Sequence, residues 1–167
     1  LEEVKTGLRQ SVLAGEVYPV ICGSAVKNIG IATLLNMIID YNPCPDDLKP
    51  KVGHALNSDE EILKPTKDSE PFAAYVFKTI VDPFVGTISL FKIYSGVART
   101  GMDVYIPNTD QTVKLPQIFS LMGKTQLQID AAYAGDIIAV AKLSELEIGY
   151  TLCDKKSPVV FDKPDYA

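Results

Sequence analysis

The pattern of apolar and polar residues divides the chain into a short mixed segment and a longer segment typical of strands. The charged residues Glu2, Glu3 and Lys5, together with the apolar Val4 and Leu8, predict a surface helix that ends near Gly15. The apolar run from Val17 to Cys22 predicts a strand that is covered on both faces. A second helix is predicted by apolar residues at helical spacing, namely Ile31, Leu34, Leu35, Ile38 and Ile39. Asn42-Pro43 ends this helix.

The longer segment predicts an all-β domain over residues 71–161. Segments rich in β-branched and aromatic residues are separated by Gly, Pro, Asn or Asp turns. Such spacing favours a small closed barrel over a parallel sheet. Residues 48–70 predict a polar connector with one short hairpin, and residues 162–167 a tail. The predicted strands of the domain cover residues 72–81, 85–94, 104–106, 112–115, 118–122, 137–141 and about 158–161.

Composition and charge restrict the class of protein only moderately. The formal net charge of the 167 residues is −5, yet residues 72–142 contain six basic and five acidic side chains. This neutral middle neither requires nor forbids an RNA partner. No apolar run is long enough for a membrane span, and the first residues do not have the pattern of a secretory leader. Because the chain starts at Leu1 inside a charged segment, we expect it to be a piece of a longer protein.

Residues for catalysis or metal binding are scarce. Cys22, Cys44 and Cys153 are far apart in the sequence, and His54 is the only histidine. This set predicts no zinc site, no Cys–His nucleophile and no disulfide, and it fits reduced cysteines in the cytoplasm. Neither a phosphate-binding G-x-x-x-x-G-K-[ST] motif nor G-x-G-x-x-G occurs. We therefore expect no catalytic residue, no metal and no cofactor in the chain itself.

The segment Cys22-Gly-Ser-Ala-Val-Lys-Asn28 resembles the last guanine-recognition motif of translational GTPases, with Ser24, Ala25 and Val26 at its centre. A strand would end there, and small residues would let backbone N–H groups approach the carbonyl oxygen of a flat base. The alternative is an ordinary strand-to-helix turn of an α/β fold. The resemblance gains weight from the Leu-Leu helix and the Asn-Pro-Cys-Pro sequence that follow.

A second resemblance covers most of the chain. Pro71-Phe-Ala-Ala74, Val76-Phe-Lys78 and Asp82-Pro-Phe-Val-Gly86 resemble the start of domain II of elongation factor G. The similarity continues in the same order through Ile93-Tyr-Ser-Gly96, Gly101, Val104-Tyr105, Ala134-Gly-Asp-Ile137 and Thr151-Leu152. The resemblance implies a mainly β fold, with a six-stranded closed antiparallel β-barrel over residues 71–161. It also implies that residues 1–47 are the α/β C-terminal remnant of a P-loop GTP-binding domain.

This resemblance implies a longer protein that binds GTP with Mg²⁺ and drives translocation on the ribosome. The chain itself would serve binding and scaffolding and would not hydrolyse GTP. In that family the barrel docks against small-subunit rRNA, so Arg99, Lys114 and Lys124 are candidate contacts to its backbone. The alternative for each of the three is a solvated surface charge.

The sequence departs from the family pattern at Leu115-Pro116, at Gly123–Gln128 and at Gly149-Tyr150. These departures place the rRNA contacts in question and suggest a divergent paralogue of the translocase. A ribosomal-protection GTPase of the tetracycline-resistance type is one alternative, although Asp82–Gly86 is more similar to factor G. A stand-alone nucleic-acid-binding barrel is the other.

Overall fold

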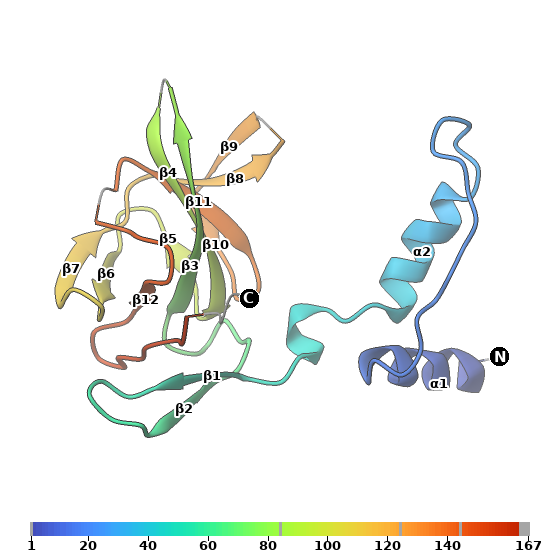
Figure 1. The fold of residues 1–167 in the computed structure, drawn as a ribbon, viewed down its shortest axis with the longest axis horizontal. Coiled ribbons are helices and arrows are strands. Elements are labelled where there is room, and N and C mark those ends of the chain that lie inside the picture. The colour runs from blue at the N-terminus through green and yellow to red at the C-terminus, as the bar shows by residue number, and fades with distance from the viewer. Residues whose placement is uncertain (1, 84, 124, 144, 164–167) are drawn as a thin grey trace. The chain divides into compact units, whose positions relative to one another are not determined.

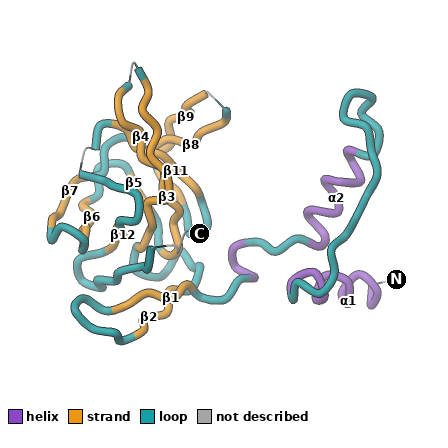
Figure 2. The backbone as a smooth tube through the Cα atoms, viewed as in Figure 1, coloured by secondary structure: helices purple, strands orange, loops and turns teal. Residues whose placement is uncertain are grey.

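The chain folds as two compact units, Leu1–Asp47 and Leu48–Ala167. The computed structural model describes residues 2–83, 85–123, 125–143 and 145–163. Figure 2 shows that the helices lie in the first unit and the strands in the second. Within the described residues, every helix is too short or too polar to cross a membrane.

The first unit contains two α-helices, α1 (Glu2–Leu13) and α2 (Ile31–Tyr41), and a 3-10 turn at Pro45–Asp47 (Figure 1). Both predicted helices are confirmed. Helix α2 ends where the sequence predicts, because Pro43 forces the residue before it out of the helical region. Asn42 accordingly has φ −77° and ψ 147°, an extended conformation.

One arginine joins α1 to the end of α2. Arg9 donates from Nη1 to the carbonyl oxygens of Asp40 (3.1 Å) and Asn42 (3.4 Å), and its Nη2 lies 2.5 Å from Asp47 Oδ2. A cation at a helix C-terminus satisfies carbonyl groups that have no partner within the helix. The backbone N–H of Cys44 also donates to Asp47, and this bond, together with the charge of Arg9, lowers the pKa of Asp47.

The predicted strand from Val17 to Cys22 is wrong, because this segment has no strand conformation in the structure. The prediction assumed neighbouring strands, and the described residues of the first unit supply none. Tyr18 is 81% exposed and Val20 88% exposed. The apolar stripe of α2 is uncovered as well, with Leu35 and Ile39 exposed and neither helix burying a residue fully.

The second unit consists of strands and loops. A hairpin of β1 (Lys51–His54) and β2 (Glu61–Lys64) comes first, as predicted within residues 48–70. The remaining strands are β3 (Ala73–Asp82), β4 (Gly86–Ser95), β5 (Ala98–Arg99), β6 (Asp103–Ile106), β7 (Gln111–Lys114), β8 (Ile118–Met122), β9 (Thr125–Ile129), β10 (Ala131–Ala132), β11 (Ile137–Ala141) and β12 (Thr151–Cys153). Eight of them form one sheet in the order β7-β6-β12-β3-β4-β11-β8-β9, and β5 pairs separately with β10.

The long hairpin of β3 and β4 is the central pair of this sheet (Figure 1). Its register shifts between Ala73 and Ala74 and again between Val76 and Lys78. Such bulges bend a strand and increase its twist, so the two strands can curve around a core. At the turn, the backbone N–H of Val85 donates to Asp82 Oδ1 at 2.9 Å.

The sheet has eight strands and is not closed, which corrects the expected closed barrel of six strands. Strands β7 and β9 are its edges in the part of the chain that the structure describes. Pro116 lies between β7 and β8 and has no N–H to donate to a ladder. The turn after β5 contacts the residue that follows each edge strand, because Gly101 N–H donates to Leu115 O (2.9 Å) and Thr100 N–H donates to Asp130 O (3.2 Å).

Five segments differ from the prediction. The sequence predicts none of the strands β5, β9, β10 and β12, and the strand that it predicts over residues 158–161 does not form. There, only Val160 pairs with another strand, exchanging backbone hydrogen bonds with His54 at 2.8 and 2.9 Å. The C-terminal segment therefore lies against the β1–β2 hairpin without joining the main sheet.

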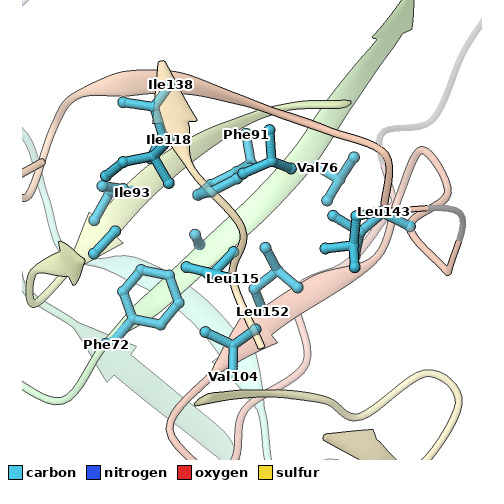
Figure 3. Packing of buried hydrophobic residues seen from close by; sticks show 14 of the residues in the cluster. Phe72, Val76, Phe91, Ile93, Val104, Leu115, Ile118, Ile138, Leu143 and Leu152 are labelled. Carbon is cyan, nitrogen blue, oxygen red and sulfur yellow. The ribbon is translucent and has the colours of Figure 1, made fainter. Parts of the chain in front are cut away.

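The two faces of the curved sheet bury separate cores. Figure 3 shows the main core, in which side chains from β3, β4, β6, β8, β11 and β12 point toward one another. Phe91, Ile93, Val104, Ile106 and Ile118 are fully buried in it. A second core lies on the other face and is covered by the C-terminal segment and the hairpin. It contains Ala73, Tyr75, Tyr105, Cys153, Val159 and Phe161, with Leu56, Ile62 and Tyr94 packed against it.

Candidate functional site

The Ser24–Ile29 loop of the first unit is closed by its own backbone. Ser24 and Ile29 exchange two hydrogen bonds, with N–O distances of 2.9 and 3.0 Å, and Asn28 N–H donates to Ala25 O at 3.2 Å. Asn28 has a φ of 54°, a left-handed conformation that asparagine tolerates better than most residues. The loop is therefore a tight turn whose shape is set locally.

Two glycines allow two backbone segments to lie close together at the base of this loop. A Cβ atom on Gly23 would lie 2.8 Å from Ile29 O, and one on Gly30 would lie 2.9 Å from Cys22 O. Gly30 also has a φ of 77° immediately before α2. Any larger residue at either position would push the two backbone segments apart and open the turn.

The tip of the loop carries two backbone donors. Ala25 and Val26 are exposed, Val26 at 99%, and within the described residues their N–H groups donate no hydrogen bond. Ser24 Oγ accepts a long hydrogen bond of 3.4 Å from Lys27 N–H, so this hydroxyl is held at the start of the turn. The arrangement can offer N–H groups to an acceptor such as the carbonyl oxygen of a base.

The basic candidates of the second unit flank one turn. Arg99 ends β5 and pairs with Ala131 of β10, whereas Lys114 ends β7 and pairs with Asp103 of β6. Leu115, the residue after Lys114, donates its N–H to the carbonyl oxygen of Met102 at 2.8 Å. Because Met102 lies in the turn between β5 and β6, this bond connects that turn to the end of β7. Arg99 and Lys114 are both exposed.

Neither Arg99 nor Lys114 forms an ion pair with a described carboxylate. Lys124, the third candidate, lies outside the described residues. The loop candidates Ser24, Ala25 and Val26 belong to the first unit, and the basic candidates belong to the second.

The structure also brings together a pair that the sequence does not suggest. His54 Nε2 lies 3.0 Å from Asp162 Oδ2, beside a hollow of about 480 Å³ that Asn57, Ser58 and Asp59 help to line. The hydrogen bond to Asp162 raises the pKa of His54. The two residues are 108 positions apart, so no local pattern could have predicted this contact.

The cysteines and carboxylates that the structure describes form no metal site. Among the described residues, no group of three or more His, Cys, Asp or Glu side chains could hold a metal ion. Cys22 and Cys44 are exposed, and Cys153 is buried. Burial raises the pKa of the Cys153 thiol, which makes it a poor nucleophile at neutral pH.

Comparison with known proteins identifies the part of the chain that has relatives. Residues 71–155 match the family model described as elongation factor G domain 2. Among solved structures, the chain is similar to a protein from Thermus thermophilus known from a crystal structure, with a TM-score of 0.71 and 27% sequence identity. The similarity covers 94% of this chain and 21% of that one, so this chain spans a small part of the other protein's length.

Proposed function

This chain belongs to the elongation factor G domain 2 family, and from that premise we propose that it is part of a translational GTPase of the elongation factor G type. The longer protein would act on the ribosome in the cytoplasm, coupling GTP hydrolysis to translocation. The single observation that carries the proposal is the match over residues 71–155, which contain strands β3 to β12. In this proposal the second unit is the part that docks on the ribosome.

The first unit is proposed to be the C-terminal end of the GTP-binding domain. Its loop supports this role, because the exposed N–H groups of Ala25 and Val26 suit the carbonyl oxygen of guanine. The phosphates and Mg²⁺ would be held by other segments of the longer protein, since this sequence has no phosphate-binding motif. The chain itself then contributes base contacts and scaffolding, and no hydrolysis.

Arg99 and Lys114 are proposed to contact the phosphate backbone of small-subunit rRNA. Both side chains are exposed, they flank one turn, and neither is engaged by a described carboxylate. Cations that are not neutralised within the protein release counterions when they bind phosphate, which is the main source of such affinity. Lys124 is included in the proposal from the sequence alone.

Binding of the chain to purified small ribosomal subunits tests this function. The double variant Arg99→Gln/Lys114→Gln removes two proposed phosphate contacts. We expect weaker binding and a slope of log K against log salt that falls by about two. The matched control is Lys5→Gln/Lys78→Gln, which makes the same change in net charge at two other exposed lysines. No binding of any form at about 50 mM salt, or equal binding of the double variant and its control, contradicts the proposal.

A further inference from the structure

Two lysines share one aromatic ring on the outer face of the sheet. Lys51 Nζ of β1 lies 5.7 Å from the ring centroid of Tyr94, and Lys92 Nζ of β4 lies 6.0 Å from the same centroid. Tyr94 in turn packs edge-on against Phe161, with ring centroids 4.9 Å apart. Both ammonium groups therefore lie within about 6 Å of one ring at the surface of the second core.

Two more lysines continue this surface. Lys64 lies directly opposite Lys51 in the β1–β2 hairpin, is only 3% exposed, and donates from Nζ to Ser157 Oγ at 3.0 Å. Lys155 precedes Ser157 by two residues, and its Nζ lies 5.6 Å from the ring centroid of Tyr105. Tyr105 and Tyr94 both pack in the second core, so the four side chains surround one cluster. We call the set formed by Lys51, Lys64, Lys92 and Lys155 the lysine face.

The lysine face is not neutralised within the described chain. The ion pairs there are Arg9–Asp47 and His54–Asp162, and neither involves a member of the lysine face. Asp154 is close in sequence, and it forms no ion pair with a member of the lysine face. Like charges directly opposite each other in a sheet destabilise it, and a buried cation without an anion is costly. An external anion would relieve both costs.

The contacts of the tyrosines indicate what kind of anion fits. Lysine ammonium groups lie over the rings of Tyr94 and Tyr105, so those ring faces are not open for stacking with bases. Lysine acts on phosphate as a point charge and requires no particular base. The surface therefore suits a phosphate backbone read without sequence preference.

We propose that the lysine face binds the phosphate backbone of RNA as a second contact surface. It lies on β1, β2, β4 and the loop after β12, none of which carries Arg99 or Lys114. The choice of RNA as the polyanion rests on the proposed function, whereas the position and the charge come from the contacts described above. Lys64 is buried and adds its positive charge to the electrostatic potential at the surface. Lys51, Lys92 and Lys155 contact the phosphates directly.

The test compares two triple variants of the whole chain in a fluorescence anisotropy titration with a labelled RNA hairpin. Lys51→Gln/Lys92→Gln/Lys155→Gln should weaken binding roughly tenfold or more at low salt and reduce the salt slope by about three. The matched control, Lys5→Gln/Lys78→Gln/Lys142→Gln, changes the net charge equally at exposed lysines outside the lysine face and should bind as the unmodified chain does. Hairpins of different sequence should bind equally well.

A third variant separates charge from folding. Lys51→Arg/Lys92→Arg/Lys155→Arg keeps the cations, so it should keep RNA binding; loss of binding there would contradict the proposal. Equal affinity and slope for the two glutamine triple variants would also overturn it, as would tighter binding to polyglutamate than to RNA. If the lysine-face variant binds normally while Arg99→Gln/Lys114→Gln is impaired, only this inference fails. If neither the unmodified chain nor any variant binds RNA or small subunits, both this inference and the proposed function fail.

Discussion

Gly96 is the position where the structure most directly forbids a side chain. Its φ is 73°, and a Cβ atom there would lie 2.6 Å from Phe72 Cα, 2.7 Å from Phe72 N and 2.7 Å from Glu70 O. All three are backbone atoms, so they cannot rotate away as a flexible side chain could. The N–H of Gly96 also donates to Lys67 O at 2.9 Å, which fixes the position of the turn.

The expected cost of Gly96→Ala follows from these two effects. The left-handed backbone costs an alanine about 1–2 kcal/mol. Forcing a methyl group into a filled site adds about 1–3 kcal/mol. We therefore expect Gly96→Ala to lower the free energy of unfolding by about 2–5 kcal/mol.

Gly101 supplies the matched control. Its φ is 80°, nearly the same, but a Cβ atom there would meet nothing within 4 Å. Gly101→Ala should therefore lower the free energy of unfolding only through the left-handed backbone conformation, by about 1–2 kcal/mol. Urea unfolding followed by far-ultraviolet circular dichroism measures both variants, and the denaturant midpoint of Gly96→Ala should be the lower. Equal destabilisation by the two substitutions would refute the steric reasoning.

Two further predictions concern pH and nucleotide. The hydrogen bond to Asp162 raises the pKa of His54, so its stabilising contribution is complete below the ordinary pKa and is lost as pH rises through the raised value. The urea midpoint of the unmodified chain should fall relative to that of Asp162→Asn between about pH 6 and pH 8, and a constant difference would contradict this. Calorimetric titration with GTP should show no binding, because two backbone hydrogen bonds of about 1 kcal/mol each cannot offset an association cost of at least ~4 kcal/mol. Micromolar affinity for GTP would contradict this prediction.

The elements that depend on local sequence could be predicted. Helix α2 was identifiable because its apolar spacing and the Asn42-Pro43 stop are both local signals. The long strands β3 and β4 were identifiable from their β-branched and aromatic residues and from the turn at Asp82. The tight turn at Ser24 also follows from nearby glycines and an asparagine.

The elements that depend on partners distant in the sequence could not be predicted. Strand β12 has only three residues, and it exists because it pairs with β3 and β6, both far away in the sequence. Strand β9 is short and three of its five side chains are polar, so the sequence does not predict a strand there. The segment at Val17 shows the reverse error, since a strand-like sequence forms no strand where the described residues of its unit supply no neighbouring strand.

The same distinction applies to the candidate sites. The sequence could place Arg99 and Lys114 near turns, but the turn that connects them depends on hydrogen bonds to Leu115. The lysine face depends on register, because Lys51 and Lys64 become neighbours only through the β1–β2 pairing. Contacts of this kind are invisible to composition, which records only a net charge of −5.

The open ends of the main sheet constrain which side chains the protein can carry there. Unpaired strand edges can recruit strands from other molecules and so promote aggregation. Strand β7 is only four residues long and ends in Lys114, and β9 carries Gln126 and Gln128 on either side of Leu127. Short length, a lysine and polar side chains all discourage edge-to-edge association. Polar character at these two strands therefore protects the solubility of the molecule, whatever else those residues contact.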